Sequence, residues 1–375
     1  MSKNTSNVAL IGATGRVGQQ VLALIATCSA GRGLRLVAVA NSRASLIARA
    51  GLDPHSAAQR LAAADSTPGD AFANALLRLP QPLVLVDCSA SAEVALRYPR
   101  WLAAGIEIVT PNKLGPSADR PLARAIASAC EASSASLRDS ATVGAQLPLL
   151  NTLRELQRAG DHVERFEAVL SGTLSYVLGR VQQGETLSAA VRDAVDQGYA
   201  EPHPAVDLSG EDAARKLVIL LRALGHDVEL ADIERVPLVE SELLSEPDSQ
   251  RLLTNLAAVD EQWRARVAVA QARRERWVYR ASFERVGPEP GRARVAPERV
   301  AIDHALAGLA PCENALILHS AYYRAAPLTV SGPGAGVELT AAAVFADLLA
   351  SARDASLRYA GVESAAVEEL DAVAA

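Results

Sequence analysis

The sequence predicts an α/β protein in which a doubly wound parallel sheet is joined to a second, α+β domain. Apolar runs alternate with helix-like stretches over residues 8–148, which is typical of a parallel sheet covered by helices. The first run ends in a glycine turn that continues as a helix. After Pro148, polar and apolar residues alternate instead, as in half-buried antiparallel strands. These three observations indicate two separate cores.

In the first domain, the strand 8–11 is closed by Gly12, and a helix is expected from Gly15 to Ile25. Further apolar runs predict strands at 36–39, 83–86 and 106–109. Ligands bind at the carboxyl ends of parallel strands. The polar residues expected at those ends are Asn41, Arg43, Asp87, Cys88, Ser89 and Lys113.

In the second region, the alternation over 162–170 predicts an antiparallel strand, and helix-like stretches follow it. Short strands are expected within 277–302. A glycine-rich turn at 331–336 leads into a helix expected over 338–349. Mixed strands and helices of this kind favour an α+β domain.

Composition excludes several classes of partner. The 37 basic and 43 acidic residues give a net charge of −6, so we expect no nucleic-acid or anionic-lipid surface. The apolar stretches are too short to span a membrane, and no signal peptide is expected. The four cysteines form no C-x-x-C pair, which favours the reducing cytoplasm. A small-molecule partner is therefore expected.

Gly12-Ala-Thr-Gly15-Arg-Val-Gly18 predicts a dinucleotide site, because it lies between the first strand and the first helix. Backbone amides and the positive helix end would face a pyrophosphate there. The spacing G-x-x-G-x-x-G is a variant of the common fingerprint, and a purely structural turn is the alternative. The predicted cofactor-binding residues of this loop are Gly12, Ala13, Thr14, Gly15, Arg16 and Val17.

The end of the second strand bears on cofactor choice. An NAD-preferring site usually has Asp or Glu there, whereas this chain has Asn41-Ser-Arg43. A neutral amide and a guanidinium suit a 2′-phosphate, so NADP is predicted in preference to NAD. The alternative is that Arg43 is a solvated surface charge. Cys88 and Ser89 are expected beside the cofactor, and no surrounding segment supports Cys88 as a nucleophile.

A pair of charged residues lies in the second region. Ser209 can cap a helix in which Asp212 is the third residue, and Asp212 and Lys216 would then share one helix face. Such a pair is, by itself, more often a surface ion pair than a catalytic couple.

Five segments carry a family resemblance when they are taken together. They are Val109–Lys113, Ala141–Pro148, Ser171–Tyr176, Gly198–Leu221 and Glu313–Leu316. From about residue 8 to about residue 352, the chain resembles the homoserine dehydrogenase family, most closely the dehydrogenase half of fused aspartokinase–homoserine dehydrogenases. Neither a kinase region nor a regulatory ACT domain is expected.

The resemblance implies a Rossmann-type first domain, a homodimer, and reversible NAD(P)H-dependent reduction of L-aspartate 4-semialdehyde to L-homoserine. It implies a dinucleotide domain of residues 1–148 and 328–352, a substrate and dimerisation domain of residues 149–327, and a tail of residues 353–375. By motif, the catalytic residues would be Lys216, Lys113 and Asp212, and the substrate-binding residues Glu201, Asp207, Thr173 and Tyr199.

Two further sites follow from the resemblance. Gly334 and Gly336 would approach the nicotinamide, with an ordinary loop as the alternative. Backbone carbonyls of Val143 and Ala145 would hold a monovalent cation. Ser140 stands where family members often have an acidic residue, so cation binding is expected to be weak or absent.

Three other departures keep rival functions open. Gln146 replaces a usual glycine, and His203 and Val206 replace residues that are often acidic. A reductase of a related amino acid semialdehyde or imine is therefore one alternative. A non-catalytic dinucleotide-sensing protein is another, although the joint presence of Lys113, Asp212 and Lys216 disfavours it.

Overall fold

The computed structural model describes residues 5–28, 32–67, 69–285 and 291–374 of the chain. They form two compact units, Met1–Gln146 with Gly336–Ala375, and Leu147–Ala335. Residues 328–335, expected in the dinucleotide domain, therefore group with the second unit. Residues 353–375, expected as a separate tail, group with the first. Within the described residues, no helix has the length and apolar character of a membrane span.

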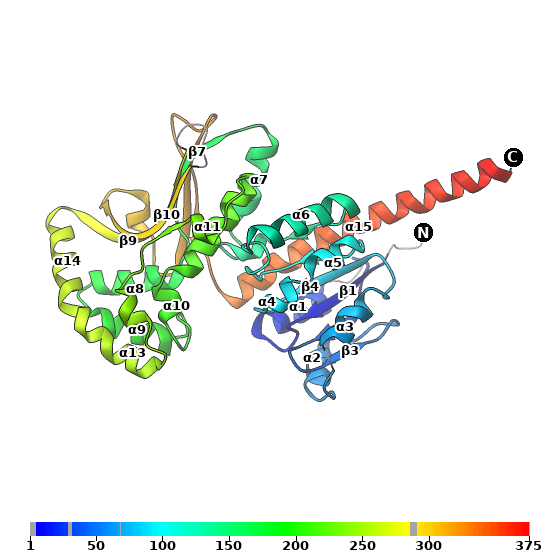
Figure 1. The fold of residues 1–375 in the computed structure, drawn as a ribbon, viewed down its shortest axis with the longest axis horizontal. Coiled ribbons are helices and arrows are strands. Elements are labelled where there is room, and N and C mark those ends of the chain that lie inside the picture. The colour runs from blue at the N-terminus through cyan, green and yellow to red at the C-terminus, as the bar shows by residue number, and fades with distance from the viewer. Residues whose placement is uncertain (1–4, 29–31, 68, 286–290, 375) are drawn as a thin grey trace. The chain divides into compact units, whose positions relative to one another are not determined.

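The first unit is built on a six-stranded sheet in the order β3-β2-β1-β4-β5-β6 (Figure 1). All neighbours pair in parallel except the edge strand β3, which is antiparallel to β2. This order confirms the doubly wound prediction and places its topological switch point between β1 and β4. The strands are β1 (Ser6–Ile11), β2 (Leu34–Ala40), β3 (Ser45–Ile47), β4 (Leu83–Asp87), β5 (Glu107–Val109) and β6 (Leu137–Arg138).

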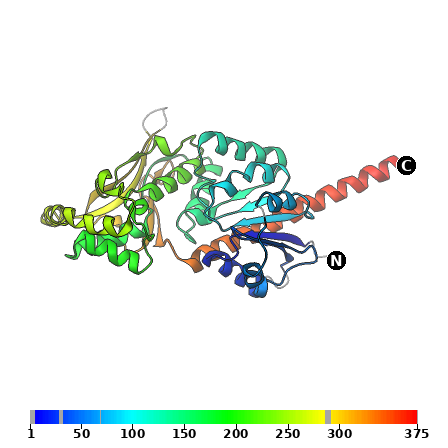
Figure 2. The same ribbon diagram turned by 60° about the horizontal axis from the view of Figure 1, so that its bottom comes forward.

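Helices cover both faces of this sheet, because successive side chains along its central strands point to opposite faces. In β1, Val8 and Leu10 join the apolar core beneath α1 and α15, whereas Ala9 and Ile11 join the core beneath α3, α5 and α6. The helix α15 lies beside α1 against β4 and β5, and continues beyond the sheet (Figures 1 and 2). The helices are α1 (Arg16–Cys28), α2 (Pro54–Ala62), α3 (Gly69–Leu76), α4 (Ala92–Ala95), α5 (Tyr98–Ala103), α6 (Arg120–Ser133) and α15 (Val337–Ala374).

The helix predicted over 338–349 is thus confirmed but is longer than expected. Its later turns stay attached to the first unit by polar contacts. The Ser6 hydroxyl lies 3.0 Å from both the Ala352 carbonyl and the Ser356 hydroxyl, and Asp354 forms a 2.5 Å ion pair with Arg138. These contacts join residues that are far apart in the sequence, so no local sequence pattern predicts them.

The second unit has the predicted α+β character. Its sheet, in the order β12-β11-β7-β9-β10-β8, is antiparallel apart from the short β10–β8 pairing. The predicted strand 162–170 is β7 (Val163–Val169), and the strands expected within 277–302 form the long hairpin β9 (Glu275–Glu284) and β10 (Arg292–Ala301). The remaining strands are β8 (Glu234–Arg235), β11 (Glu313–Ser320) and β12 (Leu328–Pro333).

Helices of the second unit pack along one end and face of this sheet (Figure 1). They are α7 (Leu149–Arg158), α8 (Gly172–Gln182), α9 (Leu187–Asp196), α10 (Ala205–Leu208), α11 (Glu211–Ala223), α12 (Ser241–Leu244), α13 (Ser249–Asn255) and α14 (Asp260–Ala272). The glycine-rich segment 331–336 is only partly a turn. Gly332 and Pro333 belong to β12, where they pair with Asn314 and Glu313 of β11, so the expectation of a turn starting at residue 331 is wrong.

Candidate active site

The glycine loop of the first unit has no room for side chains. A Cβ on Gly12, whose φ is +79°, would lie 2.7 Å from the Cys88 carbonyl carbon, and a Cβ on Gly18 would lie 2.1 Å from the Gly12 carbonyl oxygen. A Cβ on Gly15 would lie 3.3 Å from that same oxygen. The loop is therefore pressed between the ends of β1, β2 and β4. Gly12 and Gly18 are sterically required, and a side chain at Gly15 would be tight.

The first turn of α1 is the exposed part of this loop. Gly15 and Arg16 are exposed, Thr14 and Val17 are half-buried, and Ala13 is buried as part of the core. Backbone amides at such a helix start can bind a pyrophosphate. The loop therefore fits the predicted dinucleotide. Because Gly15 has no side chain, the surface at the start of α1 stays open for the pyrophosphate.

A cavity of about 230 Å³ lies next to this loop, between the ends of β2 and β4. The Asn41 Oδ1 accepts hydrogen bonds from the backbone N–H groups of Arg43 and Ala44, at 2.9 and 2.8 Å, which closes the turn after β2. The exposed Arg43 guanidinium donates to the Ala62 carbonyl at 2.5 Å. Asn41 and Ser89 line the cavity together with Gly12, so three of the predicted cofactor residues meet there.

A buried polar network supports the loop that carries Lys113. Asp87 is fully buried at the end of β4, and its carboxylate accepts from the Tyr98 hydroxyl at 2.5 Å and from Asn112 Nδ2 at 3.1 Å. Burial raises the pKa of Asp87, against the opposing effect of its hydrogen bonds. The Tyr98 ring packs where a Cβ on Gly115 would lie, 2.5 Å from a ring carbon. Tyr98 did not stand out in the sequence, and Asn112 did so only as part of the segment Val109–Lys113.

The Cys88 thiol is a poor nucleophile. Burial, followed by the neighbouring charge of Asp87, raises the pKa of Cys88, so the thiol is neutral at ordinary pH. This agrees with the expectation that Cys88 lies beside the cofactor loop without forming a covalent intermediate.

The predicted cation turn lies at the end of the first unit's main segment. Gly144 and Ala145 both have a left-handed backbone, with φ of +76° and +50°. A carboxylate does lie close by, although not from the expected position: Asp347 of α15 accepts from the Ser140 N–H at 3.0 Å and from its hydroxyl at 3.1 Å. Among the described residues, no cluster of three His, Cys, Asp or Glu side chains could hold a metal ion.

In the second unit, Lys216 is held by two oxygen atoms. Its Nζ lies 2.8 Å from Asp212 Oδ2 and donates to the Leu170 carbonyl, also at 2.8 Å. Only 13% of the Lys216 side chain is exposed. The i, i+4 pair predicted from the sequence is therefore present, but it is a largely buried pair and not a surface one.

Ser209 does not cap this helix, so that prediction is wrong. The N-cap is Gly210, with φ of +74°, and α11 begins at Glu211. Ser209 Oγ still accepts from the Glu211 N–H at 3.2 Å. Glycine is required at 210 because a Cβ there would lie 1.8 Å from the Tyr279 hydroxyl oxygen, a tertiary contact that the capping pattern cannot indicate.

The substrate residues predicted from the resemblance gather near this lysine. Asp207 Oδ2 accepts from the Glu201 N–H at 3.0 Å, and the Thr173 hydroxyl donates to the Tyr199 carbonyl at 2.5 Å. Burial raises the pKa of Asp207, and the negative charges of Asp212 and Glu201 add to this effect. A concentration of carboxylates around one lysine suits a ligand that carries an ammonium group.

Asn314 belongs to the same group of side chains, although the sequence singled out only its segment. Its Nδ2 donates to the Leu170 carbonyl that Lys216 also contacts, at 3.3 Å, and its Oδ1 is buried with no hydrogen-bond partner among the described residues. Gly334 is packed against it, since a Cβ there would lie 2.1 Å from Asn314 Cγ. Gly336 begins the segment that returns to the first unit.

Comparisons with known proteins identify the family. Residues 148–349 match the family model described as homoserine dehydrogenase, and residues 14–138 match its NAD binding domain. The chain is 37% identical over 290 residues to a homoserine dehydrogenase of Emericella nidulans, a match that covers 75% of this chain and 78% of that protein.

Longer relatives and a solved structure agree with this. The chain is 35% identical over 359 residues to the chloroplastic bifunctional aspartokinase/homoserine dehydrogenase 1 of Zea mays, which covers 93% of this chain and 38% of the relative. The chain thus spans well under half the length of such bifunctional relatives. A hyperthermophilic archaeal homoserine dehydrogenase in complex with NADPH shares the fold, with a TM-score of 0.70 and 22% identity over 94% of this chain and 98% of that one. Matches to both units and to a relative of similar length show that the chain belongs to the homoserine dehydrogenase family.

Proposed function

We propose that the protein catalyses the reversible, NAD(P)-dependent interconversion of L-homoserine and L-aspartate 4-semialdehyde. The observation that carries the proposal is the largely buried Lys216, held by Asp212 and the Leu170 carbonyl beside the carboxylates of Asp207 and Glu201. The family membership and the glycine loop of the first unit support it.

The dinucleotide would be held by the loop 12–17, by Asn41 and Arg43 near its ribose, and by Cys88, Ser89 and Lys113 toward the nicotinamide, and it supplies the hydride for the carbonyl carbon. When the aldehyde is reduced, its oxygen becomes an alkoxide that must take up a proton. The Lys216 ammonium can donate this proton from Nζ, and Asp212 keeps the lysine charged and in place. The family resemblance also makes Lys113, in the first unit, a candidate catalytic residue.

Recognition of the amino acid rests on charge. The ammonium group of homoserine is proposed to bind the carboxylates of Asp207 and Glu201. Burial raises the pKa of Asp207, and the negative charges of Asp212 and Glu201 add to this effect. Thr173 and Tyr199 line the same region, where the Thr173 hydroxyl fixes the Tyr199 backbone.

Three finer features belong to the proposal. NADP is preferred over NAD, because the chain has Arg43 shortly after Asn41 at the end of β2 and has no acidic residue there. Any monovalent cation is held weakly by the carbonyls of Val143 and Ala145, and the enzyme retains activity without sodium or potassium. The protein is a cytoplasmic homodimer. Its four free thiols are compatible with the reducing conditions of that compartment.

The test is an assay of purified protein with homoserine and either NADP+ or NAD+, followed by nicotinamide absorbance. Lys216→Ala should lower kcat by about 10²–10⁴-fold with little change in cofactor affinity. Lys216→Arg should stay strongly impaired, because a guanidinium keeps the charge but does not release a proton near neutral pH.

The matched control is Arg215→Ala, which removes the neighbouring 2.7 Å ion pair with Glu211 and should leave turnover nearly normal. Absence of homoserine oxidation by the wild type, with cofactor binding intact, would favour the sensing protein. Turnover of a related semialdehyde or imine alone would favour the other reductase.

A further inference from the structure

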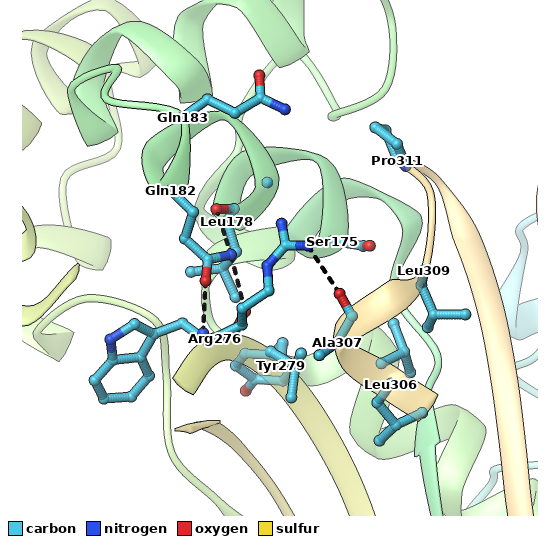
Figure 3. A pocket seen from close by; sticks show the side chains of 14 residues that line it. Ser175, Leu178, Gln182, Gln183, Arg276, Tyr279, Leu306, Ala307, Leu309 and Pro311 are labelled. Carbon is cyan, nitrogen blue, oxygen red and sulfur yellow. Dashed lines mark hydrogen bonds between the residues drawn. The ribbon is translucent and has the colours of Figure 1, made fainter. Parts of the chain in front are cut away.

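A second cavity, lined by residues other than those assigned to the candidate active site, lies in the second unit between α8 and the sheet (Figure 3). Its volume is about 250 Å³. One wall is α8, another is β9, and a third is the short helical turn Ala305–Gly308 with the residues after it. The proposed reaction uses none of its lining residues.

The cavity contains a cation, Arg276, that pairs with no carboxylate of the described residues. Figure 3 shows the Arg276 guanidinium between α8 and the turn 305–308, where Nη1 donates to the Ala307 carbonyl at 2.9 Å. Among the described residues, this is the only partner of its side chain, and no Asp or Glu lines the cavity. A guanidinium has five N–H donors, so most of them remain available to a ligand.

The α8 wall of the cavity carries a row of residues that either have a polar side chain or have none. Ser175, Gly179 and Gln183 follow one another at intervals of four residues and so share one helix face. The Ser175 hydroxyl makes no hydrogen bond with any described residue. By contrast, Gln182 is occupied by the backbone of Trp277, at 2.7 and 3.1 Å, and serves to fix β9.

Gly179 is costly for the helix and is not explained by packing. Glycine inside a helix is less stable than alanine, yet a Cβ on Gly179 would meet no atom within 4 Å. The backbone there is an ordinary helix, so neither a close approach nor a positive φ requires glycine. The missing side chain leaves open space in the cavity that Gly179 and Arg276 both line.

We propose that this cavity is a binding site for a small aliphatic carboxylate that carries no amino group. The guanidinium and the Ser175 hydroxyl would bind the carboxylate, and Leu306, Leu309 and Pro311 would contact its hydrocarbon part. One unpaired cation matches a single negative charge better than a phosphate dianion. Because no carboxylate lines the cavity, an ammonium group would lack a partner there.

The inference does not depend on the proposed dehydrogenase activity, and its test measures binding to the full chain. The probe is pentanoate, compared with pentanamide, pentylamine, norvaline and inorganic phosphate by calorimetry and ligand-observed NMR. We expect pentanoate alone to bind measurably, with a dissociation constant on the order of 1 mM for so small a ligand.

Two variants locate the binding. Arg276→Gln should weaken pentanoate binding about tenfold or more, because the charge-assisted hydrogen bonds are lost. Gly179→Ala should also weaken it by filling the cavity, while it raises the melting temperature through better helix propensity. A loss of binding in a more stable protein cannot come from unfolding. Arg273→Gln, at an exposed arginine of the same segment, is the matched control and should bind like the wild type.

Several outcomes would overturn the inference: no binding of pentanoate to the wild type, equal binding of pentanamide or norvaline, or unchanged affinity in both Arg276→Gln and Gly179→Ala. Tighter binding of phosphate than of pentanoate would also overturn it, since the site would then recognise a different anion.

Discussion

At the scale of single residues, Arg43 carries the predicted choice of cofactor. Arg43 is exposed and reaches a backbone carbonyl and not a carboxylate. Its charge is therefore available to a 2′-phosphate, and the same side chain can exchange the Ala62 carbonyl for that ligand at little cost.

Arg43→Ala should raise the KM for NADP about tenfold and leave the KM for NAD nearly unchanged, because only NADP carries the 2′-phosphate. Steady-state kinetics with both cofactors measure this. Arg60→Ala, at an exposed arginine of α2, is the control. Equal use of both cofactors by the wild type, unaffected by Arg43→Ala, would contradict the predicted preference.

Asp207 predicts a pH dependence. Burial raises its pKa, so the carboxylate takes up a proton at a higher pH than an ordinary aspartate. Protonation removes the negative charge that the homoserine ammonium is proposed to need. The KM for homoserine should therefore increase as the pH falls through this raised pKa, while it stays flat above it.

A pH series of KM and kcat measures the effect. Asp207→Asn should have a high KM at every pH, with the acid limb of the profile lost. The idea fails if Asp207→Asn keeps both the wild-type KM and its pH profile.

At the scale of elements, the part of α15 around Arg358 is integral to the first unit's fold. Arg358 forms an ion pair with Glu107 of β5, whose side chain is fully buried and also accepts from the Ser136 hydroxyl at 2.5 Å. A buried carboxylate requires a partner, since an unpaired buried charge is strongly destabilising. The residues expected as a tail thus neutralise a charge inside the sheet.

Arg358→Met should lower the free energy of unfolding by about 3–5 kcal/mol, because it leaves the Glu107 carboxylate buried and unpaired. Denaturant unfolding, followed by fluorescence, measures this. Adding Glu107→Gln to Arg358→Met should restore much of the loss, since the amide needs no counter-charge. A double variant as unstable as the sum of the two single variants would show that the two side chains do not interact.

The network around Asp87 acts at the same scale, since it joins β4, α5 and the loop of Lys113. Tyr98→Phe removes the hydroxyl that donates to Asp87 and should destabilise the first unit by about 1–3 kcal/mol. Activity should fall as well if this loop positions Lys113. An unchanged unfolding free energy would mean that water replaces the hydroxyl.

At the scale of the whole molecule, each unit has its own core. The candidate cofactor residues other than Gly334 lie in the first unit, and the candidate substrate residues lie in the second. A ligand that binds one unit stabilises that unit first, because local opening within a protein is not uniform. The cofactor residues of the first unit and the substrate residues of the second should therefore respond separately to their ligands.

Hydrogen exchange with NADPH should show added protection in the glycine loop, in residues 41–44 and 88–89, and around Lys113. The segments 170–176 and 198–221 should change little until homoserine or a substrate analogue is added. Protection that appears first in the second unit would contradict the assignment of the cofactor to the first.

Local pattern determined much of this protein. The strand–glycine–helix start, the alternating strand of β7 and the i, i+4 pair of Asp212 and Lys216 were all predictable, because each depends on neighbours within a few residues. The family resemblance added the names of the candidate residues. These features depend on the spacing of apolar residues and on local steric limits of the backbone, and both can be read directly from the sequence.

Only the tertiary structure decided the rest, because it brings together residues that are distant in sequence. The helix α11 starts after Gly210 because Tyr279 fills the space of a side chain there, and Asn314 joins Lys216 through the Leu170 carbonyl. The part of α15 that carries Arg358 packs on the first unit because Glu107 needs a counter-charge in the interior. No local pattern encodes such contacts, since burial and charge compensation are properties of the packed chain.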